Sequence, residues 1–265
     1  MQKKLMKIVP LILALSISAC GLLPEKIDET KTWSPSKLYS EARDELNSGN
    51  FDKSVKYFEK LESRYPFGTY AQQAQMEIAY AYYRQGDQPQ ALAAAERFIK
   101  LHPNHPNVDY MYYLRGLINF NDKVSALNFL SRQDATERDP KAAREAFDAF
   151  KQLADRFPAS TYTPDAIARM KYLVNAMAQY EVHVANYYYR RGAYLAAVNR
   201  AQYAVKEYPD APANEEALFI MARSYDALGM QQLRDDAERV LKTNYPKSDF
   251  FKGGRLKDAP WWKIW

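Results

Sequence analysis

Residues 79–103 read AYAYYRQGDQPQALAAAERFIKLHP, and this stretch carries the signals of two helices joined by a tight turn. Gly86 suits the left-handed conformation that follows a helix, because a residue without a Cβ adopts it at no steric cost. Pro103 ends the second helix, since proline lacks a backbone N–H and clashes with the preceding turn. The stretch therefore predicts an antiparallel pair of helices.

The same signals recur along the chain at a fixed spacing. In four places a proline lies 17 residues after a glycine, and an alanine lies 7 residues before the same glycine. The four sets are Ala42, Gly49 and Pro66; Ala79, Gly86 and Pro103; Ala185, Gly192 and Pro209; and Ala222, Gly229 and Pro246. A period in the thirties built from helix signals is typical of helical-repeat arrays, which usually serve as binding surfaces.

These features predict an all-α fold, a right-handed superhelical solenoid of five helix–turn–helix repeats over residues 34–250. The small, large and aromatic positions resemble the tetratricopeptide (TPR) pattern, whose nominal period of about 34 residues is slightly shorter than the spacing found here. The third repeat holds an insertion over residues 123–140, and the fourth lacks Gly and Pro between Pro164 and Arg191, which predicts one long helix. The repeats close near Pro66, Pro103, Pro158, Pro209 and Pro246.

The amino-terminal segment resembles the signal peptide of bacterial lipoproteins. Three lysines, Lys3, Lys4 and Lys7, precede an apolar run, residues 8–19, that is too short to span a bilayer as a helix. Small residues then lead to Cys20, the only cysteine in the chain. We expect residues 1–19 to be removed as a signal peptide, Cys20 to be lipidated, and residues 20–33 to form a lipidated tether. The alternative is that Cys20 is a buried residue of an uncleaved signal anchor.

The lipoprotein signal bears on location and on charge. Gly21 follows the cysteine, where an Asp would favour the inner membrane, so we expect a lipid-anchored protein on the inner leaflet of the outer membrane, facing the periplasm. The formal net charge of +5 includes the three lysines of the signal, which leaves +2 for the remainder. So small a charge argues against nucleic acid as a partner. A single cysteine excludes an internal disulfide.

Catalytic and cofactor-binding motifs are absent from the sequence, which holds no nucleophile elbow, P-loop or dinucleotide fingerprint. His102 and His105 share a loop between repeats, but no cysteine or carboxylate is grouped with them as a metal site requires. We therefore expect no catalytic residue, no cofactor and no metal. The sequence favours a non-enzymatic binding protein.

Tyrosine is the most abundant candidate for recognition, with 21 residues, several of them late in the first helix of a repeat. Packing between helices accounts for most of these rings. The remainder are candidates for lining a groove, where rigid amphipathic rings hold an extended peptide at low entropic cost.

The carboxyl end departs from the repeat pattern in two ways. Arg234, Asp235 and Glu238 occupy positions that are small or apolar in other repeats, so the last repeat is expected to cap the array or to form a polar docking surface. Residues 251–265 form an aromatic tail that ends in Ala-Pro-Trp-Trp-Lys-Ile-Trp. This tail is expected to pack on the last repeat, to contact a partner or to lie at the membrane interface.

Six short stretches resemble the BamD (ComL) family, lipoproteins of the β-barrel assembly (BAM) complex. They are residues 64–70 (RYPFGTY), 105–110 (HPNVDY), 113–117 (YLRGL), 138–140 (RDP), 180–181 (YE) and 191–200 (RGAYLAAVNR). The likeness covers about residues 17–246. It implies a non-enzymatic scaffold that helps to recognise, fold and insert β-barrel proteins into the outer membrane.

The resemblance also implies partners and binding residues. Unfolded outer-membrane β-barrel proteins, recognised by their C-terminal targeting strand, are expected to bind a groove near Tyr65, Phe67, Tyr70, Tyr80 and Tyr83. The periplasmic domain of the barrel protein BamA is expected to dock on the C-terminal repeats, where the family's Asn-Arg pair matches Asn199 and Arg200. The alternative for Arg200 is a solvated helix charge. Other Bam lipoproteins are further implied partners.

Two other functions stay open from the sequence alone. A TPR lipoprotein could serve as a pilotin-like adaptor for another envelope or secretion system, although such an adaptor has no reason to carry the YPFG of residues 65–68. A cell-wall lytic enzyme would need a catalytic domain, for which the repeats leave no room.

Overall fold

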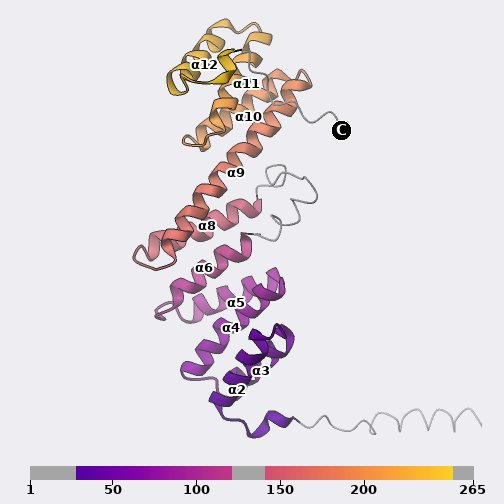
Figure 1. The fold of residues 1–265 in the computed structure, drawn as a ribbon, viewed down its shortest axis with the longest axis vertical. Coiled ribbons are helices and arrows are strands. Elements are labelled where there is room, and N and C mark those ends of the chain that lie inside the picture. Colours follow the sequence, from indigo (N-terminus) through magenta and orange to yellow (C-terminus); the bar gives the residue numbers. More distant parts are fainter. Residues whose placement is uncertain (1–27, 121–140, 253–265) are drawn as a thin grey trace, which may run out of the picture.

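The computed structural model describes residues 28–120 and 141–252, which form an elongated stack of helices (Figure 1). Ten α-helices and no strand occur within these residues, so the predicted all-α fold is confirmed. Each helix packs chiefly against its neighbours in the chain, as in a solenoid. The helix pairs are α2 (Pro35–Asn47) with α3 (Phe51–Arg64), α4 (Thr69–Gln85) with α5 (Gln88–Leu101), α6 (Val108–Asn119) with α8 (Lys141–Arg156), α9 (Thr163–Arg190) with α10 (Tyr194–Glu207), and α11 (Asn214–Ala227) with α12 (Gln231–Asn244).

The turn inside four of the pairs is built in the same way. Gly49, Gly86, Gly192 and Gly229 have φ angles of 81°, 87°, 76° and 72°, the left-handed region that glycine enters without strain. In each turn the residue after the glycine donates its N–H to the carbonyl five residues earlier, at 2.8–3.0 Å. This bond satisfies a carbonyl at the end of the first helix. The left-handed turns predicted from the glycines are confirmed.

The second helix of four pairs ends just before its proline. The preceding residue, Tyr65, His102, Tyr208 or Tyr245, has φ near −130° and ψ between 56° and 66°. A residue before proline is driven from the helical region by the proline ring, so the helix stops at this point. The N–H of each residue still bonds the carbonyl four residues back, which closes the last turn.

Small residues mark the place where the two helices of a pair cross. Ala42, Ala79 and Ala185 are fully buried. Gly116 stands one repeat period after Ala79, at the same place in the third pair, and a Cβ on it would clash with the ring of Phe150 in α8. Because Phe150 is fully buried, the crossing of α6 and α8 requires glycine. The alanine pattern thus extends to a glycine that the sequence reasoning did not include.

Helix α9 joins the lower three pairs of the stack to the upper two (Figure 1). It has 28 residues, about 42 Å of helix, and packs against α8, α10 and α11. The single long helix expected between Pro164 and Arg191 is confirmed. The insertion expected over residues 123–140 lies outside the described residues.

The end of the expected tether lies against the first pair. Its residues form the 3-10 helix η2 (Glu29–Thr32), and Asp28 accepts hydrogen bonds from Lys60 Nζ at 2.6 Å and from Arg64 Nη2 at 2.5 Å. The hydrogen bonds from Lys60 and Thr30 hold the pKa of Asp28 well below its usual range. Residues 28–33 are therefore fixed to α3.

The two chain ends are only partly visible. Residues 1–19, Cys20 and the tether up to residue 27 lie outside the described part, as does the tail from residue 253 onward. The first two tail residues belong to the 3-10 helix η4 (Asp249–Lys252). None of the described helices combines the length and the apolar character needed to cross a membrane.

Candidate binding surfaces

At two joints between repeats, the hydroxyl of a tyrosine on one first helix bonds an ion-paired carboxylate on the first helix of the next repeat. Tyr39 of α2 donates its hydroxyl to Glu77 Oε1 of α4 at 3.3 Å, and Arg43 of α2 forms an ion pair with the same carboxylate. Burial, together with the negative charge of Glu77, raises the pKa of Tyr39. The three side chains join repeat 1 to repeat 2.

The same arrangement recurs between the third and fourth repeats. Tyr113 of α6 stands two repeat periods after Tyr39, and it donates its hydroxyl to Asp165 Oδ2 of α9 at 2.7 Å. Arg169 Nε donates to that oxygen at 2.6 Å. Burial and the bond to Asp165 raise the pKa of Tyr113 to about 12. In both places a tyrosine bonds a carboxylate on the first helix of a later repeat. An arginine forms an ion pair with the same carboxylate.

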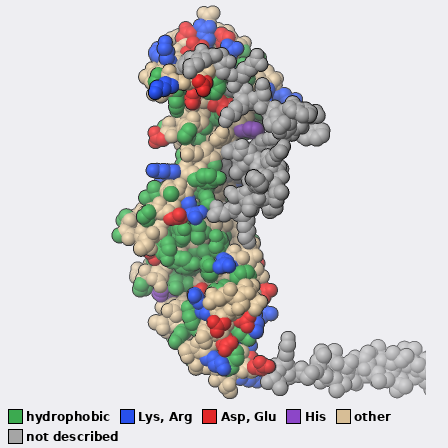
Figure 2. Space-filling model, viewed as in Figure 1, with side chains coloured by type: hydrophobic (Ala, Val, Ile, Leu, Met, Phe, Trp, Pro, Cys, Tyr) green, Lys and Arg blue, Asp and Glu red, His purple; other side chains and the backbone are tan. Residues whose placement is uncertain are grey.

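Aromatic rings continue from Tyr113 along α6 and α9. The rings of Tyr113 and Tyr162 stack at 4.9 Å with an interplanar angle of 17°, and Tyr110 lies 5.6 Å from Tyr162. Phe120 is 5.8 Å from Tyr172, which is 53% exposed. Hydrophobic side chains gather at the middle of the molecule in Figure 2, over the region of α6, α8 and the start of α9. We call these aromatic side chains, together with the tyrosines of α4 described next, the aromatic face. Its members are Tyr39, Tyr70, Tyr80, Tyr83, Tyr110, Tyr113, Phe120, Tyr162 and Tyr172.

Three of the five residues expected to line a client groove lie on α4. Tyr70 is 38% exposed and its ring lies 5.7 Å from Tyr39. Tyr80 and Tyr83 lie three residues apart, with ring centroids 6.3 Å from each other, and Arg84 donates to the Tyr80 hydroxyl at 2.9 Å. Tyr80 lies ten positions after Tyr70, about 15 Å along the helix.

The other two expected residues lie before α4. Tyr65 is partly buried, and its hydroxyl donates to the Trp33 carbonyl at 3.1 Å, so it helps to hold the η2 segment on repeat 1. Phe67 is 90% exposed in the loop between α3 and α4. The structure thus gives the Tyr65 hydroxyl a contact within repeat 1 and leaves Phe67 accessible at the edge of α4.

Asn199 and Arg200 lie side by side in sequence on α10, and both are exposed. Arg200 Nη1 bonds Glu181 Oε2 of α9 at 3.1 Å. The Glu181 side chain is 3% exposed, whereas that of Arg200 is 47% exposed. A buried carboxylate therefore anchors a guanidinium that still faces solvent. No role was predicted for Glu181 in the YE stretch, residues 180–181. In the structure it holds the guanidinium of Arg200.

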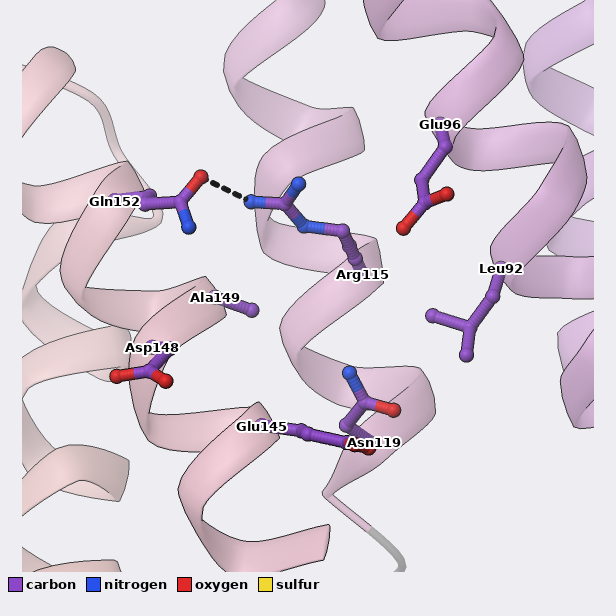
Figure 3. Close-up of a pocket in the computed structure, with 8 residues that line it drawn as sticks. All are labelled: Leu92, Glu96, Arg115, Asn119, Glu145, Asp148, Ala149 and Gln152. Atoms are coloured by element: carbon purple, nitrogen blue, oxygen red, sulfur yellow. Dashed lines mark hydrogen bonds between the residues drawn. The ribbon is translucent and has the colours of Figure 1, made fainter. Parts of the chain in front are cut away.

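A separate open pocket of about 330 Å³ lies between α5, α6 and α8 (Figure 3). Arg115 points into it and donates Nη2 to Gln152 Oε1 at 2.8 Å, with its guanidinium carbon 5.0 Å from the Tyr112 ring centroid. Burial lowers the pKa of Arg115. Three carboxylates, Glu96, Glu145 and Asp148, share the lining. Across the described residues, no group of three or more His, Cys, Asp or Glu side chains is placed to hold a metal ion.

The tyrosine–carboxylate pairs were not predicted from the sequence. The distance from Tyr39 to Tyr113 along the chain equals two repeat periods, and that spacing is the signal that could have found them. Their acceptors do not follow it, because Glu77 lies 38 residues after Tyr39 and Asp165 lies 52 residues after Tyr113. The third repeat is longer, and Asp165 also lies one helical turn before the position that matches Glu77, so the second acceptor is out of register.

Comparisons with known proteins give one consistent family. The family model described as outer membrane lipoprotein (YfiO) matches residues 31–241. The outer membrane protein assembly factor BamD of Neisseria meningitidis serogroup A is 50% identical over 99% of each chain, and that of Neisseria gonorrhoeae is 49% identical over 99% of each. The BamD of Vibrio cholerae is 38% identical over 88% of this chain and 96% of its own.

Similarity to solved structures is much weaker than these sequence matches. The crystal structure of the MamA protein aligns over 85% of this chain with a TM-score of 0.37 and 16% identity, values that carry no argument. The sequence matches decide the matter, because they extend over nearly the whole chain at up to half of all positions. The chain belongs to the BamD family of outer membrane protein assembly factors.

Proposed function

We propose that this protein is a non-enzymatic scaffold lipoprotein of the BAM complex, which helps to recognise, fold and insert β-barrel proteins into the outer membrane. One observation carries the proposal: relatives that are 50% identical over 99% of the chain are named outer membrane protein assembly factor BamD. An elongated stack of helix pairs offers a long, rigid surface, which suits a protein that holds partners together. The names of the relatives favour this function over a pilotin-like adaptor.

The aromatic face is the proposed site for unfolded β-barrel proteins. Tyrosine rings give large contact areas and lose little entropy on binding, because only two torsion angles are fixed. Tyr39 and Tyr113 are already positioned by Glu77 and Asp165, so the face is organised before a client arrives. Tyr70, Tyr80 and Tyr83 form the α4 part of this site, with the exposed Phe67 at its edge.

Arg200 and Asn199 are the proposed docking point for the periplasmic domain of BamA. The ion pair with Glu181 restricts the guanidinium, so little side-chain entropy remains to be lost when an acidic partner binds. Glu181 itself is too deeply buried to meet a partner, and it acts by positioning Arg200. The other Bam lipoproteins are proposed as additional partners of the stack.

Lipidation at Cys20 is the proposed membrane attachment, on the inner leaflet of the outer membrane. Asp28 lies eight positions after Cys20, and a fully extended chain of that length spans at most about 28 Å. Because residues 28–33 are fixed to α3, a lipid on Cys20 would hold repeat 1 within that distance of the membrane surface. Replacing Cys20 by Ser should release the protein from membranes; full retention would show that a partner or the tail is sufficient.

Depletion of the protein from its own cells tests the function directly. The proposal predicts loss of folded outer-membrane porins and accumulation of unfolded porins in the periplasm, with recovery when the wild-type chain is supplied. Folded porins at normal levels, together with loss of another envelope structure such as pili, would contradict the proposal and favour a pilotin-like adaptor.

A further inference from the structure

The last repeat has a small core whose rim is open to solvent. The buried members of this core are Val198, Ala222, Tyr225 and Ala237, from α10, α11 and α12. Four large apolar side chains lie one helical turn from a core member: Leu195 beside Val198, Leu228 beside Tyr225, and Leu233 and Val240 on either side of Ala237. Residues three or four apart on a helix share a face, so each of these four lies at the edge of the core. We call them the repeat 5 patch.

The members of this patch are substantially exposed. Leu195 is 60% exposed, Leu233 45%, Val240 38% and Leu228 36%. Such a group of apolar side chains around an incomplete core marks a surface that another segment covers. Among the charged residues of α12, Arg234 forms ion pairs with Asp226 and Asp235, whereas Asp236 lies beside Leu233 and Val240 and pairs with Arg239.

The first repeat shows that a segment outside the array can pack on an end repeat of this molecule. Tyr57 and Lys60 belong to α3, the helix that follows Gly49, and residues 28–33 lie on them. The Trp33 ring lies edge-on to Tyr57 at 5.6 Å, and Lys60 Nζ is 2.6 Å from Asp28 Oδ1. The segment that precedes the array thus packs on the second helix of the first repeat.

The matching positions of α12 are apolar. Ala237 and Val240 stand at the same distances after Gly229 as Tyr57 and Lys60 stand after Gly49; Ala237 is buried in the core shared with α10 and α11, and Val240 stays exposed beside it. No repeat follows α12 in the described chain; η4 comes next, and after it the rest of the C-terminal tail, residues 253–265. This tail contains Leu256, Trp261, Trp262, Ile264 and Trp265.

We propose that the C-terminal tail lies on the repeat 5 patch and completes the core of the last repeat, with its tryptophans as the buried anchors. The tail, residues 253–265, spans up to about 43 Å when extended, whereas the 14 residues of α12 extend about 21 Å. The tail is therefore long enough to return along the whole of α12.

The starting point of the tail supports this occupant. Helix η4, after which the tail begins, is held to the last repeat because the ring of Phe250 stacks on Phe219 of α11, with centroids 4.4 Å apart and an interplanar angle of 16°. The tail thus leaves from the repeat that carries the patch. This inference is independent of the proposed function, because it concerns contacts within one chain.

Photo-crosslinking in the full-length, membrane-attached protein tests the proposal. A photoreactive residue replaces Leu233 in one variant and Leu101 in a control, because Leu101 is 54% exposed on α5 and lies outside the patch. Peptide mapping should join position 233 to the tail and show no such product from position 101. Crosslinks from position 233 to another protein or to lipid, with none to the tail, would overturn the proposal.

Tryptophan quenching supplies a second, independent measurement. The chain has four tryptophans, and Trp33→Phe leaves only the three in the tail. In this background, acrylamide should quench the tail several-fold more strongly after Leu233→Glu/Val240→Glu, and Leu101→Glu should change nothing. The changed side chains are exposed, so the helical circular dichroism should persist. Equal quenching of parent and double variant, or protection that appears only with phosphatidylethanolamine and phosphatidylglycerol vesicles, would refute intramolecular packing.

Discussion

Two regions of the molecule pack differently from what the spacing of their turn residues suggests. One is the joint between repeats 3 and 4, and the other is the last repeat. The joint, built from α6, α8 and α9, departs from the regular spacing, yet it holds a cluster of eleven buried hydrophobic residues with Phe150 and Leu153 fully buried. The last repeat keeps the spacing, but its own cluster has four such residues. Regular spacing of turn residues therefore reports the chain path, whereas the strength of packing depends on which side chains meet inside each pair.

One position explains much of this difference. At the same distance before the closing proline, the third repeat has Phe150 and the last repeat has Glu238. Phe150 packs against Gly116, the smallest residue possible at the crossing, so a large ring and a close helix approach coexist. Glu238 is exposed at the end of the stack, where a polar surface keeps the array soluble. We expect the joint to be the most stable part of the stack and α12 the least.

Removal of a core side chain from each region gives the largest expected contrast. Phe150→Ala should lower the free energy of unfolding by about 3–5 kcal/mol, because it leaves a cavity between α6, α8 and α9. Leu241→Ala, in a side chain that is only 1% exposed on α12, should cost about 2 kcal/mol, since the thin last repeat collapses around the gap. Urea unfolding followed by circular dichroism measures both. If the two substitutions lowered the free energy of unfolding by the same amount, the proposed difference between the two regions would be wrong.

Overpacking of the same crossing is the next test. Gly116→Ala should cost about 1–3 kcal/mol, because the added methyl group meets the Phe150 ring. Phe150→Leu in the same chain should recover part of that loss by shortening the opposing side chain, which thermal melting of the single and double variants would show. If the two substitutions were simply additive, the crossing would not be the constraint.

The Arg200–Glu181 pair connects the stability of repeat 4 with its proposed docking role. Arg200→Ala should cost about 1–2 kcal/mol, less than a fully buried pair because Arg200 is half exposed, and Glu181→Gln in the same chain should restore most of it. Lys206→Ala, an exposed change on the same helix, should stay within about 0.5 kcal/mol.

The same variants separate stability from docking. If Arg200 contacts BamA, the stable double variant Arg200→Ala/Glu181→Gln should still fail to co-purify with BamA after detergent extraction. Normal co-purification of this double variant would assign Arg200 a purely structural role.

The joint between repeats 2 and 3 should show the smallest effect, a weak dependence on pH. Burial, and then the neighbouring His102, lowers the pKa of His105, whose ring lies edge-on to Phe98 at 5.2 Å. As the pH falls below about 6.5, the unfolded chain binds a proton that the folded chain resists, so stability should fall by less than about 1 kcal/mol. His105→Asn should reduce this slope in melting curves between pH 7.5 and 5.5, and an unchanged slope would exclude His105 as its source.

Much of the fold could be predicted because local rules decide it. Glycine at the left-handed turns and proline after the second helices act within a few residues, so Gly86 and Pro103 reveal a helix pair without any knowledge of tertiary contacts. The long α9 follows from the absence of such residues. The need for glycine at position 116 was not predicted, since it depends on the size of Phe150 on the partner helix of the pair.

The binding surfaces were less predictable for the same physical reason. Tyr70, Tyr80 and Tyr83 could be expected on α4 from a family resemblance, but their neighbours Tyr39 and Tyr110 come from other repeats. The bond between Arg200 and Glu181 joins two helices whose register is set by packing, and sequence spacing does not encode it. The docking of residues 28–33 on α3 was also missed, because a short polar stretch has no periodicity that separates it from a tether.

The most direct test of the central claim, that the aromatic face receives β-barrel clients, is the binding of a fluorescent peptide with the C-terminal strand of an outer-membrane β-barrel protein. Anisotropy with the full chain should show Tyr80→Ala/Tyr83→Ala weakening the affinity about tenfold or more, as loss of aromatic anchors does. Arg200→Ala/Glu181→Gln, in repeat 4, should bind the peptide as the parent does. Equal affinity for all three folded chains, or equal loss in both variants, would contradict the account.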